Sequence, residues 1–170
     1  IVMDAEHVRA ATTTVNLVSG VGAVCNALAL VTIYKKKALH NSFGLICLAI
    51  ALNNFTMISI NTIWYSMPNY PIFATDSNLN RIVGYIGITL WIFSCRTHFL
   101  ISLNRFIATV FPIYSRVAQT ESRTLGMLII LLIFSMLQNV PYLVLDDVYF
   151  TYDRSAMFWN FAQTERGKMY

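Results

Sequence analysis

Apolar residues dominate four long stretches of the chain, at about residues 12–34, 43–65, 82–111 and 124–145. Three of these stretches lie in runs without any Asp, Glu, Lys or Arg, which are found between Arg9 and Lys35, between Lys37 and Asp76, and between Arg123 and Asp146. A helix of about 20 apolar residues crosses the hydrocarbon core of a bilayer. The pattern therefore predicts an all-α, polytopic membrane helix bundle with four transmembrane helices.

Composition supports the membrane assignment. Charged residues make up 12% of the chain and hydrophobic residues 56%, whereas about 25% of an average soluble domain is charged. The net charge of +4 indicates a lipid bilayer rather than a nucleic acid as the partner, because Lys35, Lys36 and Lys37 directly follow the first span. The three cysteines lie inside spans without CxxC or histidine clusters, so no metal and no cofactor is expected.

Basic residues near the ends of the spans predict the orientation of the chain. Three lysines follow the first span, and Arg105, Arg116 and Arg123 lie at the end reached by the third span. Because cytoplasmic loops carry the excess of Lys and Arg, these segments are expected in the cytoplasm. The N-terminus and the 146–170 tail, which resembles an extracellular loop, are then expected outside the cell.

The third span carries a polar stripe. At 100° per residue, Gly87, Trp91, Ser94, His98, Ser102 and Arg105 fall within an arc of roughly 80°. We expect this face to point into the bundle, with Trp91, Ser94 and His98 either lining a pocket for a ligand or only bridging helices. Arg96 lies on the opposite face, where it must contact another helix or a carbonyl. In the first two spans, Asn26, Asn53 and Asn54 are expected to form hydrogen bonds between helices.

The end of the third span has an unusual sequence for an apolar helix, which reads Leu103-Asn104-Arg105-Phe106-Ile107-Ala108-Thr109-Val110-Phe111-Pro112. An arginine alone often only anchors a helix end at the membrane surface. The whole run resembles the Asp-Arg-Tyr-type ending of the third helix in rhodopsin-like G-protein-coupled receptors, with Asn for Asp and Phe for Tyr. Asn26 similarly matches the asparagine that these receptors carry in helix one.

A closer resemblance is to the nematode serpentine receptors of class X. It is carried by Asn41-Ser42-Phe43-Gly44, by Ala49-Ile50-Ala51, by the run from Phe99 to Phe106, and by the aromatic residues Tyr149, Phe158, Trp159 and Phe161. The resemblance implies that residues 1–161 are the N-terminal part of a seven-transmembrane receptor domain. It implies a chemosensory receptor, not an enzyme, in the plasma membrane of sensory neurons. Such a receptor couples a small external ligand to a heterotrimeric G protein, with Asn104, Arg105 and Phe106 as the switch motif.

The sequence departs from the receptor pattern in three ways. Leu52 occupies the position of an acidic residue that helps to hold sodium, and no cysteine is present for the usual disulfide between the third span and the tail. The chain also has four spans where the family has seven. We therefore expect that residues 1–170 alone do not signal, because helices missing their neighbours leave interior polar groups with too few partners.

Alternatives to a signalling receptor remain open from sequence. The chain can be a non-signalling truncated receptor product, or a small four-span channel or transport subunit. A channel would be expected to show a ladder of polar residues on several helices, but only the third span has one. An enzyme acting within the membrane would need paired catalytic groups, and the spans contain no Asp or Glu.

The orientation makes the first prediction. Glycosylation tags inserted near Ala5 and near Asp153 should both be modified in a membrane translation assay, because both positions are expected outside. A tag at Lys36 should stay unmodified. Modification at Lys36 would contradict both the orientation and the cytoplasmic place of Arg105.

Overall fold

Four long helices run side by side in a computed structural model, which describes residues 5–66, 78–114, 120–144, 149–153 and 158–161. The helices are α1 (Ala5–Lys35), α2 (Ser42–Ser66), α3 (Asn78–Val110) and α5 (Glu121–Val144). All four are long and apolar enough to cross a membrane. The predicted all-α membrane bundle is thus confirmed. α1 and α2 extend past both predicted ends, whereas α3 and α5 begin before the predicted start and end one residue before the predicted end.

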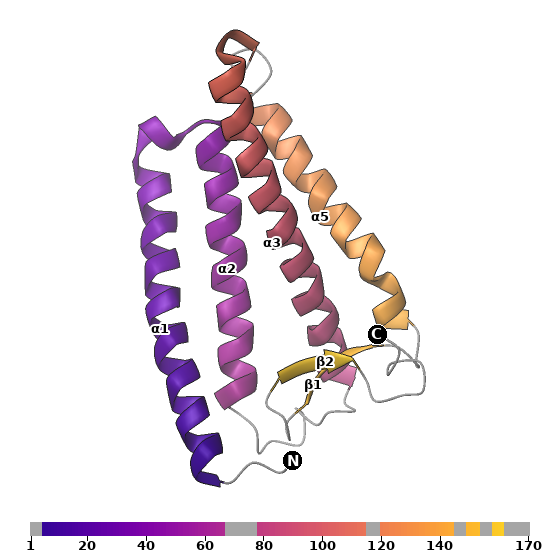
Figure 1. The fold of residues 1–170 in the computed structure, drawn as a ribbon. Coiled ribbons are helices and arrows are strands. Elements are labelled where there is room, and N and C mark those ends of the chain that lie inside the picture. The colour runs from indigo at the N-terminus through magenta and orange to yellow at the C-terminus, as the bar shows by residue number, and fades with distance from the viewer. Residues whose placement is uncertain (1–4, 67–77, 115–119, 145–148, 154–157, 162–170) are drawn as a thin grey trace.

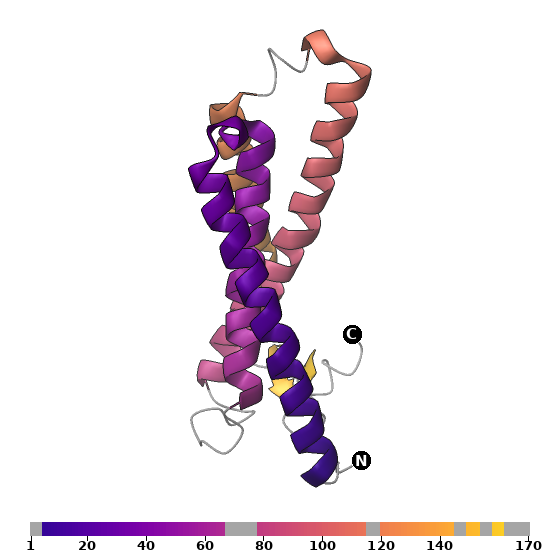
Figure 2. The same cartoon turned by 90° about the vertical axis from the view of Figure 1, so that its left-hand side faces the viewer.

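The helices follow one another in space as in sequence. α1 packs along α2, α2 along α3, and α3 along α5 (Figure 1). Figure 2 shows α3 leaning away from the other helices toward the end that carries Val110. Because α1, α2, α3 and α5 alternate in direction, the ends at Lys35, Ser42, Val110 and Glu121 lie at one end of the bundle. This end is called the Lys35 end below, and the opposite end is the hairpin end.

The turn at the Lys35 end is tight, and its sequence explains why. A short 3-10 helix, η1 (Lys37–Leu39), leads to Asn41, whose side-chain Oδ1 accepts a hydrogen bond of 2.9 Å from the backbone N–H of Gly44. This is an N-cap for α2. A Cβ at position 44 would lie 1.8 Å from the carbonyl oxygen of Leu39, so only glycine allows the turn to pack so closely.

A small antiparallel hairpin closes the hairpin end. β1 (Phe150–Asp153) pairs with β2 (Phe158–Phe161), with Phe150 opposite Phe161 and Tyr152 opposite Trp159. These strands fall within the 146–170 tail, which is predicted to resemble an extracellular loop. Other parts of that tail, at residues 146–148, 154–157 and 162–170, lie outside the described residues, as do residues 67–77 between α2 and α3.

Arg96 is accounted for by α5. Its guanidinium donates a hydrogen bond of 2.7 Å to Ser135 Oγ and a second to Gln138 Oε1, and it lies 4.6 Å from the centre of the Phe134 ring. The expectation that Arg96 contacts another helix is therefore met. Nearby, Asn139 donates to Thr89 Oγ1 at 3.3 Å, so polar contacts connect α3 and α5 at two levels along the helices.

This contact makes a second prediction. Gln138→Ala should lower the free energy of unfolding by about 1.5–3 kcal/mol, because it removes an acceptor from a charged donor. Arg96→Met should cost less, because it removes the charge together with its need for partners. The measurement is chemical or thermal unfolding of the purified chain in detergent. Leu137→Ala, which shortens an exposed side chain on the same helix, is the control. A larger loss for Arg96→Met than for Gln138→Ala would contradict the assignment.

Candidate ligand site and switch region

The hairpin is fastened to the helices through one buried asparagine. Asn80, at the start of α3, is completely buried. Its Oδ1 accepts hydrogen bonds of 3.2 Å from Trp64 Nε1 on α2 and from the backbone N–H of Tyr152. Its Nδ2 donates to Thr151 Oγ1 at 2.8 Å and to the Tyr152 carbonyl at 3.2 Å. One side chain thus joins α2, α3 and β1.

Aromatic packing completes the attachment. Trp64, Val83 and Tyr152 form a buried cluster, against which Trp159 is packed. The Trp159 ring stacks on Phe150 with 5.9 Å between ring centres, and its Nε1 donates to Asn61 Oδ1 at 3.0 Å. The hairpin approaches α3 so closely that a Cβ at Gly84 would lie 1.8 Å from the carbonyl oxygen of Phe150.

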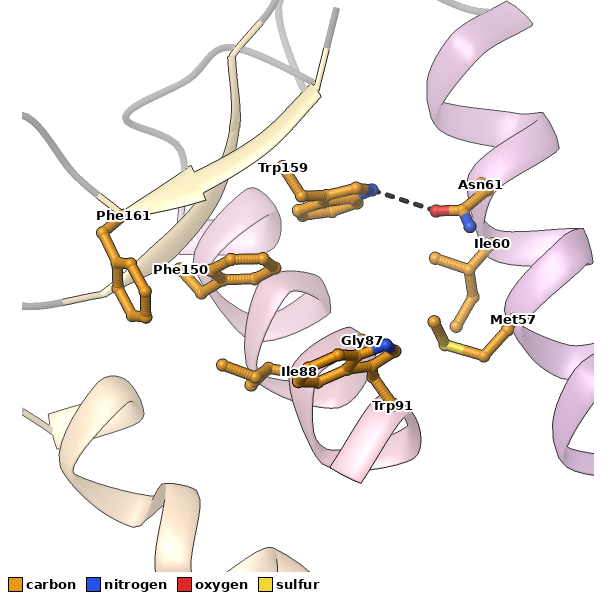
Figure 3. Close-up of a pocket in the computed structure, with 9 residues that line it drawn as sticks. All are labelled: Met57, Ile60, Asn61, Gly87, Ile88, Trp91, Phe150, Trp159 and Phe161. Carbon is orange, nitrogen blue, oxygen red and sulfur yellow. Dashed lines mark hydrogen bonds between the residues drawn. The ribbon is translucent and has the colours of Figure 1, made fainter. Parts of the chain in front are cut away.

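A cavity of about 380 Å³ lies between α2, α3 and the hairpin. This volume falls within the range of about 300–1,000 Å³ that small-molecule sites occupy. Figure 3 shows the nine lining residues, which are Met57, Ile60 and Asn61 from α2, Gly87, Ile88 and Trp91 from α3, and Phe150, Trp159 and Phe161 from the hairpin. The hairpin therefore supplies one wall of the cavity.

Of the predicted pocket residues, only Trp91 lines this cavity. Ser94 is half-buried and His98 is exposed, and both lie further along α3 toward the Lys35 end. Much of the polar stripe lies on an open face among the described helices, since Trp91 is 61% exposed and Ser102 and Arg105 are also exposed. α3 instead packs through another face, which buries Thr89, Phe93 and Thr97. Gly87 and Trp91 of the stripe line the cavity, whereas His98, Ser102 and Arg105 are exposed among the described helices, so the inward direction of the whole stripe stays a prediction.

The three asparagines expected to bridge helices do not do so among the described residues. Asn26 donates to the Gly22 carbonyl of its own helix at 2.8 Å. Asn53 is buried with neither its Oδ1 nor its Nδ2 hydrogen-bonded, and Asn54 makes no hydrogen bond. Asn61 and Asn80 make the contacts instead. Hydropathy gave no signal for them, because both lie near span ends where polar residues are ordinary.

The residues predicted to form the switch motif lie at the Lys35 end of α3. The Arg105 guanidinium lies over the ring of Phe43 on α2, 5.0 Å from the ring centre. Asn104 lines a smaller cavity of about 130 Å³ between α2, α3 and α5, whereas Phe106 is 58% exposed. Position 104 is neutral, so Arg105 has no carboxylate beside it in the motif, and an aromatic face is the contact that the structure provides.

The fold of this chain is similar to that of a protein of known structure. Squid rhodopsin has the same fold, with a TM-score of 0.73 at 18% sequence identity, over 92% of this chain and 44% of the rhodopsin chain. The described helices therefore have the arrangement found in part of a seven-helix receptor. No curated protein sequence gives a significant match.

The family follows from the sequence match. Residues 17–170 match the model of the serpentine type 7TM GPCR chemoreceptor family Srx, and the chain belongs to that family. This confirms the predicted class of membrane receptor. The chain spans less than half the length of squid rhodopsin.

The close approach at Gly84 makes a third prediction. Gly84→Ala should displace the hairpin, because the new Cβ cannot coexist with the Phe150 carbonyl, at a cost of about 1–3 kcal/mol in unfolding free energy. Tryptophan emission should shift to longer wavelength as Trp159 leaves its packed position. Gly126→Ala is the matched control, since a Cβ there meets no atom within 4 Å and alanine favours the helix. Equal behaviour of the two variants would show that the hairpin does not depend on this contact.

Proposed function

We propose that the chain is the part of a chemosensory G-protein-coupled receptor that binds a small external ligand in the hairpin-side cavity and presents Arg105 to a heterotrimeric G protein. The family match and the receptor fold support a receptor role. The proposed location is the plasma membrane, with the hairpin outside the cell, and sensory neurons are the proposed cells. The switch motif is Asn104, Arg105 and Phe106.

One observation carries the proposal: the same two helices form the cavity and the switch region. α2 lines the cavity with Met57, Ile60 and Asn61, and its other end carries Phe43. α3 lines it with Trp91 and carries Arg105 fourteen positions later, about 21 Å along the helix axis. A ligand that changes how α2 and α3 pack at one end therefore acts on the Arg105–Phe43 contact at the other.

The mechanism is a shift between two packings of α2 and α3. With Arg105 held over Phe43, the guanidinium is directed toward α2. A ligand that fits the cavity better in a second packing increases the population of that packing by its difference in affinity. Small helix displacements are a common form of such transitions. Release of Arg105 from Phe43 then makes the charge available to a cytoplasmic partner.

The competing four-span channel or transport subunit lacks support of this kind. Polar side chains on the open face of α3 are not matched by a continuous polar face on the other described helices, whose exposed positions include many Leu, Ile, Val and Phe side chains. A functional test separates the non-signalling alternative from a signalling receptor.

The fourth prediction tests the switch. Residues 1–170 are expressed alone and joined to the last three spans of another Srx member, and G-protein activation and surface display are measured in cells. We expect activation only from the extended chain, and loss of it with Arg105→Ala. Phe43→Leu should raise basal activation, because it removes a contact of about 0.5–2 kcal/mol that restrains Arg105.

The matched control is Phe99→Leu, which shortens an exposed aromatic residue on α3 away from Arg105. It should leave basal activation unchanged. Activation by the extended chain that survives Arg105→Ala at equal surface display would refute the proposed role of this residue. Activation by residues 1–170 alone would refute the expectation that this part does not signal.

A further inference from the structure

The chemistry of the cavity wall restricts which ligand can bind there. None of the nine lining residues has an ionisable side chain, and four of them are aromatic, namely Trp91, Phe150, Trp159 and Phe161. A charged group in such a site would lose hydration without gaining an opposite charge. For a cation, attraction to the faces of the aromatic rings returns only about 0.5–2 kcal/mol of that cost. The wall therefore favours a neutral and largely apolar molecule.

Asn61 provides the main polar group, and its orientation is fixed. The indole Nε1–H of Trp159 can only donate, so the atom of the Asn61 amide that faces it at 3.0 Å must be the oxygen. The amide nitrogen then points away from Trp159, and Figure 3 shows it on the side of Ile60. In the described part of the chain this nitrogen has no hydrogen-bond partner.

Trp91 offers a second donor. Its indole side chain lines the cavity, is 61% exposed, and makes no hydrogen bond with any described residue. The Oδ1 of Asn61 is the one side-chain acceptor oxygen among the nine lining residues, and Trp159 already occupies it. The side chains of the cavity thus present two available N–H donors and an acceptor that is already used.

We propose that this cavity selects a neutral, mostly apolar molecule carrying a hydrogen-bond acceptor oxygen, of the ketone, ester or ether type, and discriminates against amines and other cations. The proposal deepens the proposed function by giving the chemical class of its ligand, and it rests on the same cavity. The acceptor oxygen binds the Asn61 amide, and the hydrocarbon part packs against the aromatic rings. Binding itself needs no G protein.

The chain contains its own reporter of this binding. It has three tryptophans, of which Trp91 and Trp159 line the cavity and Trp64 lies with its ring centre 6.2 Å from that of Trp159. Tryptophan emission of residues 1–170, reconstituted in lipid nanodiscs, therefore responds to occupation of the cavity. Three probes with one skeleton separate the chemistry: 4-tert-butylcyclohexanone, the corresponding cyclohexylammonium, and tert-butylcyclohexane.

The expected result is a saturable emission change with the ketone, about fivefold weaker binding of the hydrocarbon, and weaker binding still of the ammonium. Asn61→Asp keeps an acceptor for Trp159 but replaces the free donor by negative charge. It should weaken ketone binding by about fivefold or more and strengthen ammonium binding. Trp91→Phe keeps an aromatic ring and should weaken ketone binding by a smaller factor.

Filling the cavity locates the site. Gly87→Leu should abolish the saturable change, because space is open beside Gly87 inside the cavity, whereas Gly126→Leu places the same side chain in open space on α5 and should leave it intact. If Gly87→Leu does not fold, the reversal of preference by Asn61→Asp decides alone. The proposal would be overturned if the ketone and the hydrocarbon bound equally, or if the ammonium bound more tightly than the ketone. An emission change that persists in Gly87→Leu would also overturn it, because the probes would then be partitioning into lipid.

The outcome is separate from that of the proposed function. Ketone binding with the expected preferences, but no G-protein activation by the extended chain, leaves the ligand class standing and refutes coupling. Activation that depends on Arg105, but no selective binding of the ketone in the cavity, refutes the ligand class and leaves coupling standing.

Discussion

The hydrogen bonds of Asn80 are the constraint on which the hairpin-side cavity depends. All the hydrogen-bonding groups around this amide are buried, and both of its polar atoms have partners on α2 or β1. A buried donor or acceptor that loses its partner costs about 1–3 kcal/mol, and a substitution here would remove the hydrogen bonds to the Trp64 N–H and to the Tyr152 backbone together. Without this attachment, Phe150, Trp159 and Phe161 would not form a wall, and the cavity between α2 and α3 would be open.

This arrangement also explains how the hairpin is held without a disulfide. The receptor resemblance implies a cross-link between the start of the third helix and the tail, yet the three cysteines, Cys25, Cys47 and Cys95, are all free thiols within helices. Asn80 at the start of α3 and Thr151 in β1 join the same two segments by a hydrogen bond of 2.8 Å. Such a link does not depend on redox conditions, but it is strong only while water is excluded from it. The surrounding rings of Trp64, Tyr152 and Trp159 exclude the water.

Sequence was sufficient for the spans and the family motif but not for the site. Long uncharged runs predict membrane helices because a bilayer requires a fixed apolar length, and the Arg105 motif stands out because arginine is costly in such a helix. Periodicity located the polar stripe with Trp91, but it could not tell which face of α3 its neighbours would bury. The hairpin was missed because strands of four residues acquire their structure from docking, here on Asn80 and at Gly84, and not from local preference.

The neutral residue at position 104 has an energetic consequence for the proposed switch. An adjacent carboxylate would hold Arg105 by an ion pair, but Asn104 has no charge and the guanidinium rests instead on the Phe43 ring. A cation–π contact contributes about 0.5–2 kcal/mol, depending on how far it is desolvated. A ligand needs to bind the released packing only about 2- to 30-fold more tightly than the restrained one to offset that contact. An apolar cavity with one or two hydrogen-bond donors can provide a difference in affinity of this size. The binding energy available in the cavity is therefore enough to offset the contact that restrains Arg105.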